Sequence, residues 1–221
     1  MYGIERASNF LAYHISMLLD YDKDHEEVLA YGAFVIIQTF INILCVVIFG
    51  KIFGVTLEAL IISIVASLLR KYSGGVHATS PGRCIAIGTI GFVGMALLVD
   101  LLVRTNITFV AVSNVLSLLS VIFIITKYAP VDTPDKRIVD KAKRERLRRQ
   151  ALEALAFLTL LQIIFWLLYF YFQFSILLNL IISICLGVIW QSFTLTALGH
   201  AFIIRLDMIF KDIYLIIGGE R

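Results

Sequence analysis

A short polar stretch of the chain, RKYSGGVHATSPGRC at residues 70–84, places a histidine and a cysteine between two long apolar runs. His77 precedes Cys84 by seven residues. Glycines and a proline interrupt the stretch, so the backbone is able to fold back and bring the imidazole to the sulfur. A thiol within hydrogen-bonding reach of an imidazole is an activated nucleophile. The spacing therefore permits cysteine catalysis. A lone histidine and cysteine in a membrane protein are more often packing residues or weak metal ligands.

The residues around this pair predict where two helices end and begin. Gly74 and Gly75 predict the end of the preceding helix, because glycine readily adopts the left-handed geometry of a C-cap. A serine followed by Pro81 predicts the start of the next helix. Cys84 is then expected in or just after the first turn of that helix. Free backbone N–H groups, the helix dipole and the charge of Arg83 favour a thiolate there.

Composition predicts that these helices lie in a membrane. The chain has 221 residues, of which 60% are hydrophobic, and its mean hydropathy is +0.91. A soluble domain is usually about 45–50% apolar, and one core of this size cannot hide such an excess. A helix of roughly 20 apolar residues crosses the hydrocarbon. The chain offers six such runs, near 31–50, 52–70, 84–103, 107–126, 151–172 and 175–198.

The sequence thus predicts an all-α integral membrane protein with about six transmembrane helices. The very short connections GKIFG, RTN and QF pair the runs into three hairpins. Residues 1–28 are expected to form an amphipathic helix, in the membrane interface or packed on the remaining domain, 29–221. Irregular backbone at membrane depth is stable only when buried in protein or lining a wet cavity. The polar stretch after the second run is therefore expected to shape a pocket.

The distribution of basic residues predicts the orientation. Lysine and arginine concentrate in the loop 127–150, in residues 70–83 and in the C-terminal tail, whereas the opposite connections carry only Lys51 and Arg104. The positive-inside rule then puts both termini and the polar stretch on the cytoplasmic side. The basic loop serves either to fix topology and contact anionic lipids, or also to collect an acidic peptide.

Several other functions find no support in the sequence. The three cysteines, Cys45, Cys84 and Cys185, form neither a disulfide framework nor a CxxC pattern. The polar stretch offers two nitrogen or sulfur ligands, whereas a structural zinc site usually needs four, so no metal or cofactor is expected. Basic residues do not interleave with aromatic ones as on a nucleic-acid-binding surface. The N-terminus lacks the pattern of a cleavable signal peptide.

The polar stretch resembles the signature of the AgrB family, the accessory gene regulator protein B of Gram-positive quorum sensing. The matching residues are Arg70, Gly74, Gly75, His77 and Cys84, in the order R-x-x-x-G-G-x-H-x-x-x-x-x-x-C. The similarity extends over most of the chain, with a polar N-terminal helix, about six spans, the motif after the second span and a basic loop after the fourth.

This resemblance implies a membrane cysteine endopeptidase of the bacterial cell membrane. Such a protein cuts the C-terminal part from a small AgrD-like precursor peptide and helps to cyclise the rest into a thiolactone or lactone signal. Cys84 is then the nucleophile and His77 the general base, while Arg70, Gly74 and Gly75 support them. The partners implied are the precursor, membrane lipids and a second copy of the chain.

The resemblance also implies how the precursor is recruited. Precursors of this type carry an amphipathic leader and a largely acidic tail. The leader is expected beside residues 4–27. The tail is expected to meet basic residues of the cytoplasmic side, namely Lys71, Arg83, Arg144 and Arg148.

Two other classes of function remain open on the sequence. A transporter or channel needs a polar pathway, and the spans hold few interior charges: Glu58, Asp100 and Glu153. A transporter would tolerate Cys84→Ala, and a non-catalytic scaffold would tolerate replacement of the whole motif. The group that orients the imidazole is not assigned, and the polar candidates inside apolar runs are Gln38, Asn42, Glu58 and Ser67.

Overall fold

The computed structural model describes residues 2–132 and 139–218, which fold almost entirely into α-helices. Eight helices are seen in these ranges: α1 (Tyr2–Leu19), α2 (Lys23–Ile52), α3 (Thr56–Ser73), α4 (Pro81–Val103), α5 (Ile107–Tyr128), α6 (Lys141–Phe172), α7 (Ser175–Phe193) and α8 (Ala197–Gly218). The predicted all-α class is confirmed.

Five of the described helices, α2, α4, α5, α6 and α7, are long and apolar enough to cross a membrane. The second predicted run forms α3, which has 18 residues and includes Glu58, Arg70 and Lys71. The other five helices each contain an 18-residue stretch with at most two charged side chains, whereas α3 carries three in its whole length. It is nevertheless well enclosed, because seven of its residues are buried. The fold is therefore that of an integral membrane protein, with α3 as a polar-ended helix inside the bundle.

The core lies around α3 and α7, which contribute to both buried clusters. One cluster joins α3 and α7 to α5 and α6 through residues such as Leu69, Ile125 and Leu158. The other joins them to α2 and α4 through residues such as Ile62, Ala96 and Ile182. Large apolar side chains are exposed on the outer faces of α2, α5 and α6. Such faces suit helices that are surrounded by lipid.

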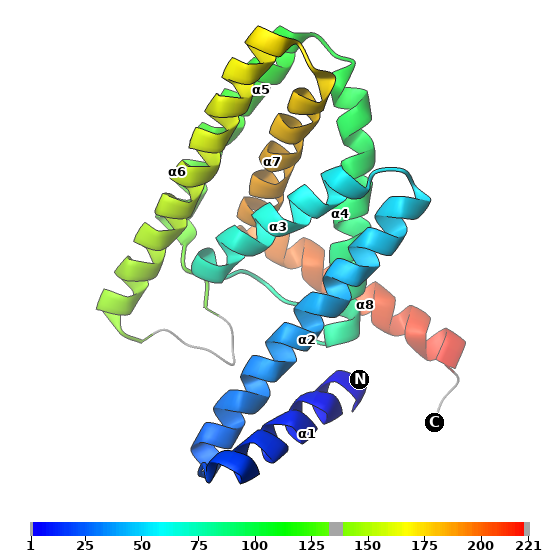
Figure 1. The fold of residues 1–221 in the computed structure, drawn as a ribbon, viewed down its shortest axis with the longest axis vertical. Helices are drawn as coiled ribbons and strands as arrows, with labels where there is room; N and C mark the ends of the chain where they lie inside the picture. Colours follow the sequence, from blue (N-terminus) through cyan, green and yellow to red (C-terminus); the bar gives the residue numbers. More distant parts are fainter. Residues whose placement is uncertain (1, 133–138, 219–221) are drawn as a thin grey trace.

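Figure 1 shows that both ends of the described chain, the connection 74–80 and residues 129–132 lie toward one end of the bundle. The connections 104–106 and 173–174 lie at the opposite end. Helix α3 lies tilted across the middle of the bundle between α2 and α4 (Figure 1). Which end faces the cytoplasm stays a prediction from the charge distribution.

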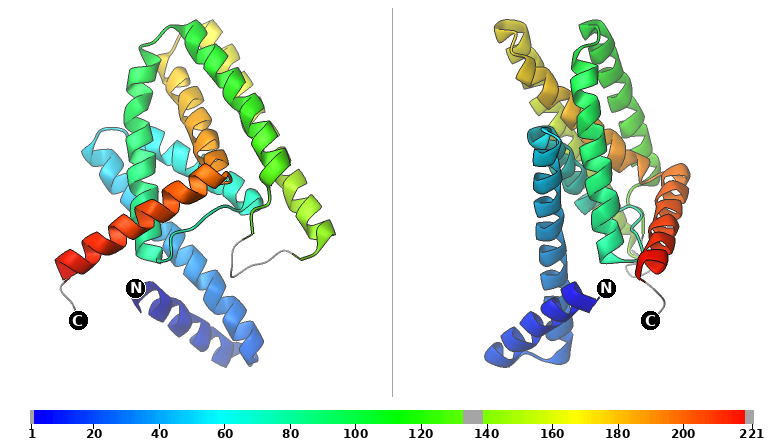
Figure 2. Two further views of the ribbon diagram at one scale, coloured as in Figure 1. Left: turned by 180° about the vertical axis from the view of Figure 1, so that it is seen from behind. Right: turned by 90° about the vertical axis from the view of Figure 1, so that its right-hand side faces the viewer.

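The expected hairpins differ in how closely their helices pack. Helices α2 and α3 contact each other, as do α6 and α7, whereas α4 and α5 separate after their short connection. Helix α7 packs against both α4 and α5. The rear and side views show that α4 and α5 diverge from their short connection (Figure 2). The reason is steric, since α7 occupies the space between the two arms.

Two helices begin earlier than the apolar runs that predicted them. Asp22 caps α2 by accepting a hydrogen bond from the backbone N–H of His25, and Asp140 caps α6 in the same way from Ala142. An apolar run detects only the part of a helix that suits lipid, whereas an N-cap lets the helix continue into polar surroundings. Residues 141–149 of the expected basic loop are therefore the first turns of α6. Residues 133–138 of that loop lie outside the described ranges.

Helix α1 packs on α2 through small side chains. Ser8, Ala12 and Ser16, spaced four residues apart, are buried, and α1 contacts α2. Phe10 and Leu18 are 62% and 84% exposed. The helix thus turns bulky apolar groups outward, and its location in the membrane interface stays a prediction.

Candidate active site

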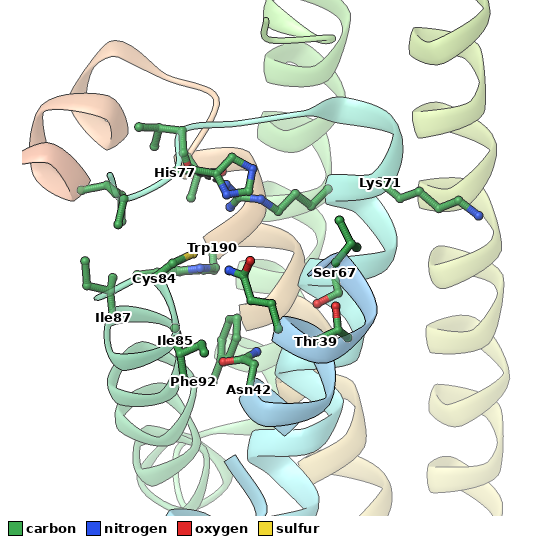
Figure 3. Close-up of a pocket in the computed structure, with 18 of the residues that line it drawn as sticks. Thr39, Asn42, Ser67, Lys71, His77, Cys84, Ile85, Ile87, Phe92 and Trp190 are labelled. Atoms are coloured by element: carbon green, nitrogen blue, oxygen red, sulfur yellow. Dashed lines mark hydrogen bonds between the residues drawn. The ribbon is translucent and has the colours of Figure 1, made fainter. Parts of the chain in front are cut away.

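A cavity of about 490 Å³ lies where α2, α3, α4 and α7 meet the segment that follows α3. His77 and Cys84 both border it, together with Arg70. Farther along its wall, Phe92 and Trp190 give it an apolar surface (Figure 3). The structure therefore brings the predicted base, the predicted nucleophile and the motif arginine to one cavity.

His77 comes from the extended segment after α3, and Cys84 from the start of α4 (Figure 3). Among the described residues, no hydrogen bond joins the imidazole to the thiol. Such bonds often tighten only when substrate is bound. The two side chains therefore share one cavity without a direct hydrogen bond between them.

The glycine pair makes a turn that other residues could not make. Gly74 has φ +69° and Gly75 has φ +133°. A Cβ atom on Gly74 would lie 2.3 Å from the carbonyl oxygen of Val131, and one on Gly75 would lie 2.9 Å from Oγ1 of Thr194. The backbone N–H of Val131 donates to the carbonyl of Ser73 at 2.9 Å. The turn is thus held closely between the segment 129–132 and the end of α7.

The side chain of Gln191, on α7, forms hydrogen bonds with the same glycine turn. Its Nε2 donates to Oγ of Ser73 at 3.0 Å and to the carbonyl of Gly74 at 2.7 Å. The side chain is almost fully buried. Gln191 was not among the residues predicted from the sequence. The available signal was a glutamine inside an apolar run, since such residues usually face the bundle interior.

Arg70 holds the segment that carries the histidine. Its Nη2 donates to the carbonyl oxygens of Gly75, at 3.4 Å, and of Val76. Its charge also acts on both His77 and Cys84. Arg70 therefore combines a structural contact with a positive charge next to the thiol.

The His77 ring is exposed where it borders the open cavity. Protein atoms nevertheless surround it closely enough that desolvation, with the charge of Arg70 as a second cause, lowers the pKa of His77 to about 4. The imidazole is consequently neutral at pH 7. The neutral form is the one that accepts a proton from a thiol.

Cys84 is the fourth residue of α4, which begins at Pro81. Ser80 occupies the N-cap position as expected, but its side chain makes no capping hydrogen bond. The N–H of Cys84 donates to the carbonyl of Ser80 at 2.9 Å, so it is already used within the helix. The N–H groups of Gly82 and Arg83, the two residues directly before Cys84, have no helical acceptor.

The four basic residues expected to bind a peptide tail have different surroundings. Lys71 borders the cavity, but its ammonium group points away from His77 and Cys84 (Figure 3). Arg83 forms an ion pair with Asp207 of α8, with 2.5 Å between Nε and Oδ1. The other two residues contact the segment 129–132: Arg144 pairs with Asp132 at 2.7 Å, and Arg148 donates to the carbonyl of Ala129 at 2.8 Å.

Of the polar candidates for orienting the imidazole, Gln38, Asn42 and Ser67 border the cavity. Glu58 instead accepts a hydrogen bond from Asn179 at 2.9 Å. Oδ1 of Asn42 is buried and has no hydrogen-bond partner among the described residues. A buried acceptor without a partner is costly, so Asn42 is ready to bind a polar group that enters the cavity.

No group of three His, Cys, Asp or Glu side chains within the described ranges is arranged to hold a metal ion. Cys45 and Cys185 are free cysteines outside this cavity. Cys185 lies 3.0 Å from the hydroxyl of Ser117. The described cavity thus presents a thiol, an imidazole and a guanidinium group inside a helical membrane protein.

Comparison with known proteins agrees with this class of membrane protein. The family model described as Accessory gene regulator B matches residues 5–195. A protein of Clostridium perfringens (strain SM101 / Type A) named "Putative AgrB-like protein" is 34% identical over 206 residues, which are 92% of this chain and 96% of the relative. "Putative AgrB-like protein 2" of Clostridium perfringens (strain 13 / Type A) has the same identity and coverage. No solved structure matches.

The chain belongs to the accessory gene regulator B family. This assignment confirms the family that the motif resembled. The matched residues contain the whole stretch 70–84 and helices α2 to α7. Helix α8 begins after the matched region ends.

Proposed function

We propose that this chain is a membrane cysteine endopeptidase that cuts the C-terminal part from a small AgrD-like precursor peptide and closes the remainder into a thiolactone or lactone. The observation that carries the proposal is the single cavity bordered by Cys84, His77 and Arg70. Membership of the accessory gene regulator B family supports the same role. A thiol, a neutral imidazole and a nearby positive charge are the groups that a cysteine nucleophile needs.

In the first step, His77 takes the proton from Sγ of Cys84, and the thiolate attacks the scissile carbonyl carbon. The charge of Arg70 stabilises the thiolate. The N–H groups of Gly82 and Arg83, which lack a helical acceptor, serve as backbone donors for the oxyanion. The C–N bond then breaks, His77 gives its proton to the leaving amine, and the acyl part stays on Cys84 as a thioester.

In the second step, a cysteine or serine side chain of the bound peptide attacks that thioester. Its proton passes through His77 to the sulfur, which leaves as the free thiol of Cys84. The attack is intramolecular within the peptide, so its effective molarity is high. Water has to be kept from the thioester, and the apolar wall near Phe92 and Trp190 serves that purpose.

The energetics predict a dependence on the products. A peptide bond is more stable than a thioester, so the first step is uphill. Removal of the cleaved tail or of the ring is then needed to draw the reaction forward. Accumulation of the ring in the presence of a high concentration of intact tail would contradict this inference.

Recruitment of the tail rests best on Lys71, which borders the cavity. Arg83, Arg144 and Arg148 are engaged with other groups of the protein and would have to exchange those partners. Lys71→Gln is expected to raise the KM for an acidic-tailed peptide without a comparable fall in kcat. A fall in kcat alone would contradict a recruiting role.

The primary test is co-expression with an AgrD-like precursor, followed by mass spectrometry of the peptide. Wild type is expected to release the tail, whereas Cys84→Ala and His77→Ala are not. Cys185→Ala is the matched control, because it removes a thiol outside the cavity. Equal cleavage by Cys84→Ala would end the cysteine mechanism and favour the transporter alternative.

The proposal includes the location and assembly. We place the protein in the bacterial cell membrane, with both termini and the stretch 70–84 on the cytoplasmic side, because the basic residues concentrate there. Labelling of single cysteines placed in 104–106 and in 74–80 with an impermeant reagent tests this. Labelling of a cysteine in 74–80 from outside intact cells would show that the orientation is the opposite of the proposed one. Cross-linking in the membrane tests the expected homodimer.

A further inference from the structure

Helix α8 packs against α4, the helix that carries Cys84. One side chain of α8, Asp207, reaches the stretch between His77 and Cys84. Oδ1 of Asp207 accepts from Nε of Arg83 at 2.5 Å. Oδ2 accepts from the hydroxyl of Thr79 at 2.7 Å and from its backbone N–H at 3.3 Å.

The three residues form a closed set. Arg83 also donates to the hydroxyl of Thr79, so Thr79, Arg83 and Asp207 contact one another in pairs. Thr79 lies two residues after His77, and Arg83 immediately precedes Cys84. The carboxylate therefore joins the two ends of the short connection between the base and the nucleophile.

The burial of this ion pair distinguishes it from the surface pairs. The side chains of Arg83 and Asp207 are only 19% and 9% exposed. Burial acts to raise the pKa of Asp207, but hydrogen bonds from Arg83 and Thr79 outweigh it and lower the pKa below its usual value. By contrast, Arg104 and Asp100 at the other end of α4 are 75% and 72% exposed. Removing one partner of an enclosed pair leaves an uncompensated charge, whereas an exposed pair contributes little.

We propose that Asp207 is a positioning residue, which fixes Thr79 and Arg83 and thereby sets the place of Cys84 relative to His77. The family model ends at residue 195, so the inference comes from the contacts of this chain. The expected effect of Asp207 on catalysis rests on the proposed function. The expected effect of Asp207 on the placement of Cys84 relative to His77 is independent of that function.

The first experiment measures kcat and KM of peptide cleavage for Asp207→Asn, Arg83→Gln and the double variant. Misplacement of the nucleophile is expected to lower kcat by roughly tenfold or more, with little change in KM. The double variant should be no worse than the poorer single variant, because both remove the same interaction. Asp100→Asn, the same chemical change in an exposed ion pair at the other end of α4, should match wild type.

The second experiment needs no peptide substrate. The rate of alkylation of Cys84 by iodoacetamide is followed by mass spectrometry over a range of pH. Removing the Asp207 charge leaves Arg83 uncompensated beside the thiol, so Asp207→Asn should lower the pH midpoint of alkylation. Arg83→Gln should raise it. Opposite shifts in this midpoint together with a common fall in kcat separate positioning from a simple effect of charge.

A cycle with His77 measures the coupling itself. In the wild-type background, His77→Ala is expected to slow alkylation of Cys84 at neutral pH. In the Asp207→Asn background, it should have little further effect, because the two groups are no longer held together. An undiminished effect of His77→Ala in that background would overturn the proposal, and so would multiplicative losses of kcat in the double variant.

The exchanged pair, Arg83→Asp with Asp207→Arg, guards against simple misfolding of the single variants. Its charges are again matched. The effect of His77→Ala on the alkylation rate of Cys84 should therefore be larger in the exchanged pair than in Arg83→Asp alone. If wild type cleaves no peptide, the proposed function fails, while the alkylation cycle still decides the role of Asp207. Failure of the exchanged pair to recover any coupling, with normal accumulation in the membrane, would count against the proposal.

Discussion

Replacing Gly74 with alanine is the sharpest test of how the site is built. Gly74 has φ +69° and ψ −149°, a conformation open essentially to glycine and costing other residues about 1–3 kcal/mol. A Cβ atom would also lie 2.3 Å from the carbonyl oxygen of Val131. Backbone atoms cannot yield to that distance, so the segment 129–132 has to move away from the turn.

This movement disrupts two hydrogen bonds of the turn. It breaks the hydrogen bond from Val131 to the carbonyl of Ser73 and weakens the one from Gln191 to Gly74, each worth about 1 kcal/mol. Together with the backbone strain, the native turn loses about 3–5 kcal/mol. Since about 1.4 kcal/mol is a factor of ten in population, the native turn would become roughly a hundredfold or more less populated.

The assay compares the rate of peptide processing with thermal unfolding in detergent. Processing by Gly74→Ala is expected to fall by roughly a hundredfold, while the unfolding temperature falls less, because the turn can rearrange without unfolding the bundle. Gly94→Ala is the matched control, since its Cβ atom would meet nothing within 4 Å. Wild-type processing by Gly74→Ala would refute the reasoning.

Three further predictions concern residues around the cavity. Arg70→Gln removes one cause of the low pKa of His77, so the acid limb of the pH profile of kcat/KM should move to higher pH, and an unmoved limb would exclude an electrostatic role. Asn42→Leu removes a buried oxygen that has no partner, so the protein should be at least as stable, while KM rises by about two- to tenfold; an unchanged KM would show that this oxygen does not bind the peptide. Gln191→Leu removes both bonds to the glycine turn and should lower the free energy of unfolding by about 1–3 kcal/mol, measured by thermal or denaturant melting against Gln173→Leu, an exposed glutamine at the end of α6.

The sequence was most informative where the physical signal is local. Runs of apolar residues predicted the positions of helices α2 to α7, because a helix in lipid satisfies its own backbone and needs only apolar side chains. The glycine pair, the serine and Pro81 predicted the break between α3 and α4 for an equally local reason. Helix ends were less well predicted, since α6 starts at Lys141, ten residues before its apolar run.

The sequence was less informative about partners that are distant along the chain. Arg83 was expected to meet a peptide, but it pairs with Asp207, 124 residues away. Gln191 contacts Gly74 across 117 residues. Neither pairing leaves a periodic or compositional trace, because any carboxylate or amide at the right point in space would serve.

The chain by itself thus determined its class, an all-helical membrane protein, and the stretch that carries His77 and Cys84. Both follow from transfer of apolar groups out of water and from the conformational preferences of single residues. Only the tertiary structure decided that Arg70 holds this stretch beside the cavity, that Gln191 and Val131 enclose its glycine turn, and that Asp207 joins its two ends. These contacts depend on how the helices pack, and packing brings together groups whose separation along the chain carries no information about their distance in space.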